Sequence, residues 1–322
     1  FMKSIFPLID FGIDFHSGSG GRTNYPQVRC KTGSELELDL AKKFNQPFIV
    51  NASLRSGSLR KISTLQKKPI LLFEGGQSNP TFQLITPKKT FVMRKQPPGE
   101  LLPSAHQVDR EFKVMDALWD TAVPVPKMYL LNEDTEIVGT KFYVMEMVEG
   151  RLFTETRLPQ LPKEQRKSLY EDLARVLAEL HKVNVEKVGL GEFGRPGNYY
   201  ERQISRWSKQ YLASQTEQIE AMDNLMAWLP DNIPDASSSA IVHGDFRLGN
   251  VLVHPKHPKI VAVLDWELST LGDGLADLGY MCQEYHGDSE SPDGLAGANL
   301  EELGIPNESR ILHTYCEQRG IE

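Results

Sequence analysis

The sequence is poor in cysteine and has no long apolar run. Its three cysteines, Cys30, Cys282 and Cys316, lie far apart and form no C-x-x-C pair. This spacing argues against a disulfide framework or a zinc ribbon and favours a reducing, cytoplasmic compartment. No apolar stretch reaches the roughly 18–20 residues that a membrane span needs, so we expect no membrane partner.

An excess of positive charge is also missing. Lys and Arg number 36 against 43 Asp and Glu, for a net charge of −7. Nucleic-acid binding needs a basic face, so we expect no nucleic-acid partner. The 322 residues suffice for two or three domains, and 40% hydrophobic content is ordinary for a globular chain. The chain begins at Phe1 and ends at Glu322 without a tail, so we expect both ends to be cut from something longer. The sequence gives no prediction of the oligomeric state.

Hydrophobic periodicity predicts two lobes after residue 74. Strands and one helix come first, followed mostly by helices with a small polar hairpin, and the join falls near residues 146–152. The helix in the first lobe is expected over residues 104–120, with Ser104 as its N-cap. The expected strands are 81–86, 90–95, 126–132 and 141–148, and the expected helical regions of the second lobe are 163–189 and 199–229.

The stretch IVHGDFRLGN, residues 241–250, concentrates polar groups between two apolar segments. Asp245 precedes Asn250 by five positions, and Asp265 follows the apolar run VAVL. Phosphoryl transfer needs a carboxylate that accepts the proton of the attacking hydroxyl and oxygen ligands for Mg²⁺. The spacing therefore predicts Asp245 as the catalytic base and Asn250 and Asp265 as magnesium ligands. An Asx-rich hairpin without catalytic function is the alternative.

HGDFRLGN, LDWE and GDGLADLG together resemble the aminoglycoside phosphotransferase (choline kinase-like) family of the protein kinase fold. GGQSNPTF, FVMRKQPPG and YVMEMVEGR resemble more closely the kinase-like domain attached to acyl-CoA dehydrogenase family members ten and eleven. The resemblance covers residues 75–322. It implies an α+β, two-lobed kinase-like fold, with a small antiparallel-sheet lobe and a large helical lobe, and ATP and Mg²⁺ as cofactors.

The resemblance also implies roles for residues around the motif. His243 braces the loop rather than moving a proton, and Asp277 ties the catalytic loop to the helix that follows. Arg247 either reaches a phosphate or pairs with a surface acid. Trp266 stands in place of the phenylalanine of D-F-G, so activation-loop switching of the protein-kinase type is not implied.

The small lobe is expected to hold ATP. Arg94 or Lys95 takes the place of the strand lysine that grips the phosphates, with Glu111 as its helix partner. Because relatives often carry arginine there, Arg94 is favoured, and Lys95 is expected to point outward on the alternating strand. A G-x-G-x-x-G loop is absent, so the expected phosphate cover is GGQSN, and backbone groups near Glu146 and Met147 are expected at the adenine. The cover residues are Gly75, Gly76, Ser78 and Asn79.

Residues 1–76 resemble a fragment of another family, the succinylglutamate desuccinylase/aspartoacylase zinc hydrolases. The resemblance rests on the D-x-H that ends at His16 and on the E-x-G that begins at Glu74. That family also needs an upstream H-x-x-E, which this chain lacks, and catalytic zinc needs three protein ligands. We therefore expect a partial α/β segment whose zinc site, His16 and Glu74, is vestigial.

These patterns predict three segments: a partial hydrolase-like segment at 1–74, a kinase-like N-lobe at 75–147 and a C-lobe at 148–322 that is truncated at its C-terminus. The predicted function is ATP-dependent phosphorylation of a hydroxyl on a small-molecule acceptor. The resemblance implies that the acceptor is a hydroxyacyl group carried on coenzyme A. Choline and aminoglycosides are the alternative acceptors. The alternatives are an inactive pseudokinase or fusion product, and a zinc-dependent deacylase.

Overall fold

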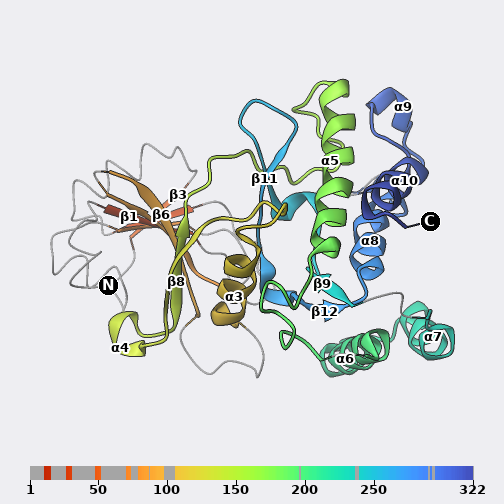
Figure 1. The fold of residues 1–322 in the computed structure, drawn as a ribbon, viewed down its shortest axis with the longest axis horizontal. Coiled ribbons are helices and arrows are strands. Elements are labelled where there is room, and N and C mark those ends of the chain that lie inside the picture. The colour runs from red at the N-terminus through yellow and green to blue at the C-terminus, as the bar shows by residue number, and fades with distance from the viewer. Residues whose placement is uncertain are drawn as a thin grey trace. The chain divides into compact units, whose positions relative to one another are not determined.

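The computed structural model describes two compact units, Phe1–Trp119 with Val125–Glu149, and Asp120–Pro124 with Gly150–Glu322 (Figure 1). Before residue 79 the structure describes the backbone of four strands, and beyond that point it describes residues 79–86, 88–97, 106–195, 197–235, 239–288, 291 and 294–321.

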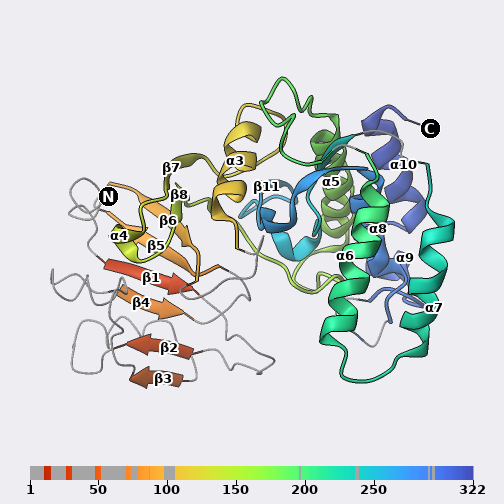
Figure 2. The ribbon, with the colours of Figure 1, turned by 90° about the horizontal axis from the view of Figure 1, so that it is seen from below.

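The first unit is built on an eight-stranded sheet in the order β3-β2-β4-β1-β5-β6-β8-β7 (Figure 2). Its second half is antiparallel throughout, as hairpin-linked strands require. The strands are β1 Phe11–Phe15, β2 Gln27–Cys30, β3 Phe48–Asn51, β4 Ile70–Phe73, β5 Thr81–Ile85, β6 Thr90–Lys95, β7 Met128–Asn132 and β8 Phe142–Glu146.

Strand β1 joins the two halves of this sheet. It pairs parallel with β4 and antiparallel with β5, with Phe15 opposite Thr81. The patterns LIDFGIDFH and KKPILLFEGG predict strands at residues 8–16 and 67–76, and β1 and β4 lie within these ranges. The pattern GSELELDLAKKFN predicts a helix over residues 33–45, which lie outside the described part of the chain. Strand β1 thus continues the sheet formed by β5–β8. The boundary expected at residue 74 stays a prediction.

Alternation along β5 and β6 gives the antiparallel half two different faces. Phe82 and Met93 are buried in an apolar cluster on one face, while Arg94 points to the other. Helix α3, Val108–Leu118, packs against β7 and β8. The short helix α4, Thr135–Val138, contributes Val138 to the apolar cluster and ends at Gly139, whose φ of 85° suits glycine.

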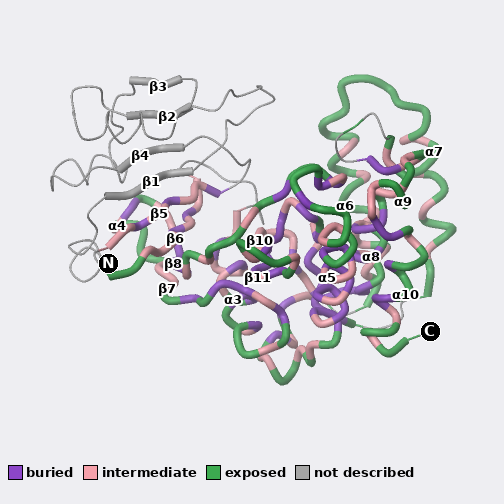
Figure 3. Tube along the Cα trace, turned by 90° about the horizontal axis from the view of Figure 1, so that it is seen from above, coloured by how far each residue is buried: buried purple, intermediate pink, exposed green. Residues whose placement is uncertain are grey.

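The second unit is centred on α5, Lys163–Lys182, whose apolar stripe is buried. It packs against α10, Glu308–Arg319, and also contacts strands β9 (Ala240–Val242) and β11 (Ile260–Val263) and helix α8 (Leu275–Cys282). Figure 3 shows that burial is concentrated around these elements, whereas α6 and α7 are largely exposed. The other helices are α6 Tyr199–Ser214, α7 Glu220–Trp228, α8 Leu275–Cys282 and α9 Leu300–Leu303.

Two small antiparallel ladders carry the polar motif. Strand β9, Ala240–Val242, pairs with β12, Thr270–Gly272, and β10, Val251–Val253, pairs with β11, Ile260–Val263. Short 3-10 turns precede β10 and follow β11, at Leu248–Asn250 and Trp266–Leu268. The catalytic-loop motif thus runs from the end of one ladder to the start of the other.

Three boundaries differ from the sequence-based expectation. Helix α3 begins at Val108 with Gln107 as its N-cap, so Ser104 is not the cap residue. Helix α5 ends at Lys182, and residues 199–229 form two helices broken near residue 215. Helix ends depend on local capping geometry that hydrophobic periodicity does not reveal. Among the helices that the structure describes, none combines the length and the apolar character that crossing a membrane demands.

Candidate active site

The candidate catalytic loop, residues 243–250, connects β9 to β10. Gly244 has φ of 85°, and a Cβ there would lie 2.9 Å from the carbonyl oxygen of Leu268. Only glycine fits both the left-handed backbone and this close approach. The glycine of the H-G-D motif is therefore explained by a tight turn that brings Asp245 out of the strand.

His243 links this loop to the segment that carries Asp265. Its Nε2 donates to the carbonyl of Leu264 at 2.9 Å, and its Nδ1 accepts from the backbone N–H of Asp245 at 3.2 Å. With one nitrogen donating and the other accepting, the ring is in the neutral Nε2–H tautomer. Complete burial lowers the pKa of His243, against the opposing effect of Asp277. His243 thus serves as a brace.

Asp277, on α8, holds the same loop from the other side. Its Oδ2 accepts from the backbone N–H of His243 at 2.6 Å, and its Oδ1 accepts from that of Gly244 at 2.8 Å. Asp277 is only 1% exposed, so these bonds compensate the cost of burying its charge. The structure therefore joins the catalytic loop to α8 through a buried carboxylate.

Behind Asp277 lie two further buried groups. His181 of α5 places Nε2 at 3.3 Å from Oδ2 of Asp277, and its Nδ1 is 2.7 Å from the hydroxyl of Tyr315 on α10. The chain Tyr315–His181–Asp277 spans three helices and is buried throughout. Burial keeps the pKa of the Tyr315 hydroxyl raised, to about 12. The loop is thus supported by residues far away in the sequence.

Asp245 and Asn250 are brought together. Asn250 Nδ2 donates to Oδ2 of Asp245 at 2.7 Å and to the Asp245 carbonyl at 2.8 Å. Arg247 places Nε at 3.3 Å from Oδ1 of Asp245. Of the two alternatives for Arg247, the structure shows pairing with an acid, and that acid is the candidate base.

Asp265 stands at the end of β11 with φ of 65° and ψ of 55°, a left-handed conformation that aspartate tolerates better than most residues. The next residue, Trp266, is fully buried and its ring lies 4.6 Å from that of His243. Leu264, just before Asp265, donates its N–H to the carbonyl of Asn250 at 2.8 Å. The two candidate magnesium ligands therefore sit on segments joined by backbone hydrogen bonds.

The donor set fits magnesium. Because Nδ2 of Asn250 faces Asp245, its Oδ1 is oriented away from that carboxylate, and Asp265 supplies an anionic oxygen. Mg²⁺ prefers a few oxygen ligands and keeps several waters. Within the described part of the chain, no three His, Cys, Asp or Glu side chains cluster in a way that suits a metal ion.

In the first unit, Arg94 of β6 lies beside Glu111 of α3, with Nε at 3.2 Å from Oε2. Glu111 is 1% exposed and accepts hydrogen bonds from Asn79 at 2.7 Å and from the Tyr143 hydroxyl at 2.9 Å. The His106 ring in turn meets Oδ1 of Asn79 at 3.0 Å. Three predicted residues, Asn79, Arg94 and Glu111, are thus joined in one network centred on the buried Glu111.

Lys95 does not point outward to solvent as expected. Strand alternation sends it to the face opposite Arg94, but there its Nζ donates to the carbonyl of Val138 at 2.8 Å. The residue is only 8% exposed, because the end of α4 covers this face of the sheet. Lys95 is therefore a buried anchor for α4.

Glu146 and Met147 lie where β8 ends. The Glu146 side chain is occupied by Lys89, with Oε1 and Nζ 3.8 Å apart, and by the backbone N–H of Lys127. Among the described residues, none accepts a hydrogen bond from the N–H of Met147 or Val148. Free backbone groups at a strand end are what an adenine ring requires, so the residues present fit the nucleotide.

The remaining predicted residues lie outside the described part of the chain. These are Gly75, Gly76 and Ser78 of the expected phosphate cover, and His16 and Glu74 of the vestigial zinc site. Their predicted roles stay predictions.

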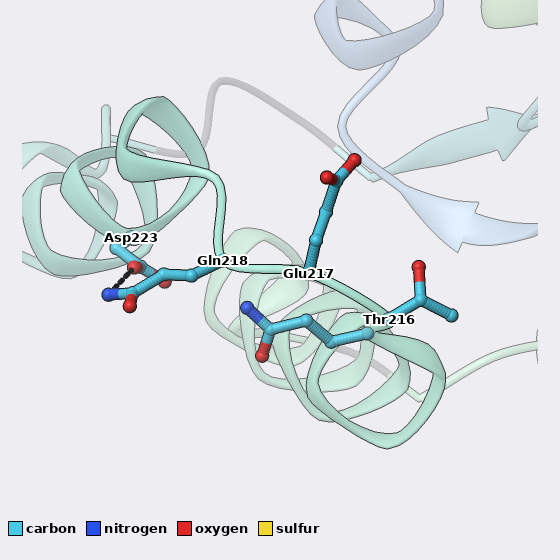
Figure 4. A pocket seen from close by; sticks show the side chains of 5 residues that line it. Thr216, Glu217, Gln218 and Asp223 are labelled. Carbon is cyan, nitrogen blue, oxygen red and sulfur yellow. Dashed lines mark hydrogen bonds between the residues drawn. The ribbon is translucent and has the colours of Figure 1, made fainter.

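A separate hollow of about 350 Å³ lies at the turn between α6 and α7 (Figure 4). Its lining is polar and mostly exposed, and Gln218 Nε2 donates to Asp223 at 3.0 Å across it. No predicted site residue lines this hollow.

The sequence reasoning missed His181, Tyr315 and Tyr143. His181 contacts Asp277, 96 residues later in the chain, and Tyr315, 134 residues later, and no local pattern reveals these contacts.

Fold and loop geometry define a kinase-like phosphotransferase. The sequence profile described as "Phosphotransferase enzyme family" matches residues 69–312, and the chain belongs to this family. A crystal structure from Ralstonia eutropha, assigned as an aminoglycoside phosphotransferase, is 47% identical with a TM-score of 0.70, covering 76% of this chain and 73% of that one. The aminoglycoside-3'-phosphotransferase of type VIII shares the fold at 20% identity and a TM-score of 0.54, covering 74% and 81%. The expected α+β kinase-like fold is confirmed.

Among curated proteins, the chain is similar to human acyl-CoA dehydrogenase family member 11, at 41% identity over 300 residues. The match covers 90% of this chain but only 38% of the human protein. Mouse acyl-CoA dehydrogenase family member 10 is 42% identical over 254 residues, covering 78% of this chain and 24% of the relative. The resemblance to the kinase-like domain of these proteins is thereby confirmed.

Proposed function

We propose that this chain transfers the terminal phosphoryl group of ATP to a hydroxyl group of a small molecule. The observation that carries the proposal is the loop 243–250, in which Asp245 is held by Asn250 and Arg247 while Asp277 and His243 fix the backbone. A preorganised carboxylate next to an amide ligand is the constellation that phosphoryl transfer needs.

In this proposal Asp245 accepts the proton of the attacking hydroxyl. Its carboxylate is partly exposed, with 24% of its side chain accessible, so an acceptor can approach. Asn250 and Asp265 hold Mg²⁺, which when bound neutralises charge on the phosphate oxygens. The His243 and Asp277 contacts keep Asp245 in place, because a small displacement of a catalytic group lowers the rate sharply.

The nucleotide is assigned to residues of the first unit. Arg94, oriented by Glu111, supplies positive charge for the phosphates. Backbone groups of Met147 and Val148 suit the adenine, and Asn79, a residue of the expected phosphate cover, is held by its hydrogen bond to Glu111. Gly75, Gly76 and Ser78 complete that cover on sequence grounds.

The acceptor is proposed to be a hydroxyacyl group carried on coenzyme A. Support comes from the relatives: the chain matches part of longer proteins named as acyl-CoA dehydrogenases, whose substrates by name are acyl-CoA thioesters. A kinase segment in such a protein would act on the same carrier. Choline and aminoglycosides are the competing acceptors, the latter because the Ralstonia neighbour is assigned to that activity.

Mass spectrometry of an acceptor panel tests this function. Purified protein with Mg·ATP is offered 3-hydroxybutyryl-CoA and 4-hydroxybutyryl-CoA, choline and kanamycin, and each product is scored for a phosphate adduct. The proposal expects phosphorylated hydroxyacyl-CoA that disappears in Asp245→Asn. If only kanamycin or only choline is phosphorylated, that compound is the acceptor and the hydroxyacyl-CoA proposal is wrong. If no compound of the panel is phosphorylated, the pseudokinase alternative is favoured.

A further inference from the structure

His181, in the last turn of α5, has both ring nitrogens engaged by side chains of the second unit. Its Nε2 lies 3.3 Å from Oδ2 of Asp277 on α8, and its Nδ1 lies 2.7 Å from the hydroxyl of Tyr315 on α10. None of the three residues is more than 2% exposed. The ring is thus held between two protein groups rather than solvated.

The plane of the His181 ring is fixed by packing. A Cβ at Gly274, the residue before α8, would lie 2.6 Å from Nδ1 and 2.7 Å from Cγ of His181, so the ring rests directly on the backbone of Gly274. The Tyr315 ring also meets it edge to face, with centroids 5.7 Å apart and an angle of 73°. Any other residue at position 274 would displace the ring, which accounts for the second glycine of the GDGLADLG motif.

The partners of the two nitrogens decide which of them carries the proton. Asp277 already accepts the backbone N–H groups of His243 and Gly244, at 2.6 and 2.8 Å, as an ionised carboxylate does. Such a carboxylate only accepts, so Nε2 of His181 donates to it. Nδ1 of the neutral ring is then an acceptor, and the Tyr315 hydroxyl donates to it. Burial raises the pKa of Tyr315 to about 12, so this hydroxyl keeps its proton at neutral pH.

We propose that Tyr315 is a positioning residue: by donating to Nδ1, it keeps the proton of His181 on Nε2, where it orients the Asp277 carboxylate that holds the catalytic loop. The inference rests on the proposed function, because the next residue of that loop is the candidate base, Asp245. Without the tyrosine hydroxyl, the ring can carry its proton on Nδ1, and a bare Nε2 then faces the carboxylate. Two acceptors repel each other, so Asp277 would turn and weaken its bonds to the loop.

The test compares Tyr315→Phe with Tyr170→Phe. Phenylalanine keeps the ring and removes only the hydroxyl. Tyr170 is the matched control, because it is 4% exposed in the same unit and its hydroxyl donates to the carbonyl of Thr156 at 2.7 Å. Both variants lose one buried hydrogen bond of a tyrosine, but only the bond of Tyr315 ends on His181. Melting temperatures report how far each fold is weakened, and rates are measured where every variant is folded.

The first readout needs no catalytic activity. Long-range ¹H–¹⁵N correlation spectra show which ring nitrogens are protonated, and we expect His181 of the wild type and of Tyr170→Phe to be protonated on Nε2 alone. In Tyr315→Phe we expect another tautomer or a mixture, with amide hydrogen exchange at His243 and Gly244 about fivefold faster or more. A wild-type ring protonated on Nδ1 overturns the inference even if Tyr315→Phe does not fold. A tautomer that Tyr315→Phe leaves unchanged overturns it as well.

The second readout is ADP formation with Mg·ATP and the best acceptor of the panel, or with water alone. In Tyr315→Phe we expect kcat to fall about fivefold or more while the KM for ATP stays within about twofold. Tyr170→Phe should keep the wild-type values. His181→Gln retains an N–H near the place of Nε2 but removes the acceptor Nδ1. In the His181→Gln background, Tyr315→Phe should therefore change kcat by less than about twofold.

A kcat of Tyr315→Phe within about twofold of the wild type overturns the positioning role. An equal loss from Tyr315→Phe with and without His181→Gln also overturns it, because the tyrosine would then act independently of His181. A wild-type protein that forms no ADP removes the proposed function, whereas the tautomer and the exchange rates still decide whether Tyr315 holds the loop. The two failures are therefore distinguishable.

Discussion

The side chain of Asp277 and the backbone of Gly244 are joined by a hydrogen bond of 2.8 Å. The bond connects a helix to a loop 33 residues earlier in the chain, and it forms where Gly244 takes a backbone conformation with φ of 85°. The candidate base, Asp245, is the next residue. The geometry of the loop therefore depends on a glycine conformation and on a buried carboxylate together.

Replacing Gly244 with alanine should destabilise the fold. The new Cβ would meet Leu268 at 2.9 Å in a left-handed backbone, at a cost of about 1–3 kcal/mol in the free energy of unfolding. Gly279→Ala is the matched control, since no atom lies within 4 Å of its Cβ and it sits inside α8. Gly279→Ala should leave the free energy of unfolding unchanged or raise it by about 0.5–1 kcal/mol. Chemical denaturation measures both, and equal stability of the two variants would contradict the interpretation of Gly244.

Asp245→Asn should lower turnover far more than it weakens ATP binding. Loss of a general base typically costs about 10²–10⁴-fold in rate. Asparagine is close in shape, and removal of one negative charge should leave nucleotide affinity intact or slightly higher. Steady-state kinetics with the best acceptor, or ADP release without one, gives the rate, and calorimetry gives the affinity. Wild-type turnover in Asp245→Asn would show that the base lies elsewhere.

Mg·ATP should stabilise the protein, and Asp265→Ala should remove this effect. A ligand at 100 times its dissociation constant adds about 2.7 kcal/mol to the free energy of unfolding, which thermal melting detects. Asp235→Ala, at an exposed position, serves as the control and should keep the full shift. An unshifted melting temperature of the wild type at millimolar Mg·ATP would count against nucleotide binding.

Arg94→Gln and Lys95→Gln should distinguish the roles of two adjacent basic residues, one in ATP binding and one in stability. Arg94 is paired with Glu111 on the face of α3, so its loss should raise the KM for ATP about tenfold or more. Lys95 donates to the carbonyl of Val138 on the opposite face, so its loss should lower the melting temperature with little effect on that KM. The reverse pattern would assign the phosphate-binding role to Lys95.

The stability should also depend on pH through His243. Burial lowers its pKa in the folded state from the ordinary 6.5, so below that pH the unfolded chain binds a proton that the folded chain does not. The free energy of unfolding should then fall as the pH drops below about 6.5, by at most about 1.4 kcal/mol per pH unit from this one group. His243→Gln should flatten that slope, whereas His286→Gln, at a side chain that is 71% exposed, should not. Identical slopes in all three proteins would contradict a neutral His243.

The sequence predicts elements and residue roles whose signals are local, and the roles themselves stay predictions. Asp245, Asn250 and Asp265 lie within 21 positions of one another, and their spacing reflects one loop and one strand end. Strand alternation was enough to send Arg94 and Lys95 to opposite faces of β6. It could not show that Lys95 is buried, because the covering group is the carbonyl of Val138, 43 positions away.

Long-range support could not be predicted in the same way. His181 looks like an ordinary residue at the end of an amphipathic helix, and Tyr315 like part of a surface helix. Their side chains meet only because α5 and α10 pack together. The start of α3 was misplaced for a related reason: Ser104 is a good cap by residue type, but the chain enters the helix at Gln107.

The contact between His181 and Tyr315 has a consequence for synthesis of the chain. Their separation is 134 residues, and Asp277 lies between them in the sequence. At about 5–20 residues per second, a ribosome needs on the order of 10 s to pass from one to the other. Helix α5 therefore emerges well before the partner of its last turn, and the loop 243–250 leaves the ribosome before its support is complete. A translational pause ahead of α10 would lengthen the interval in which the catalytic loop is exposed to chaperones and proteases.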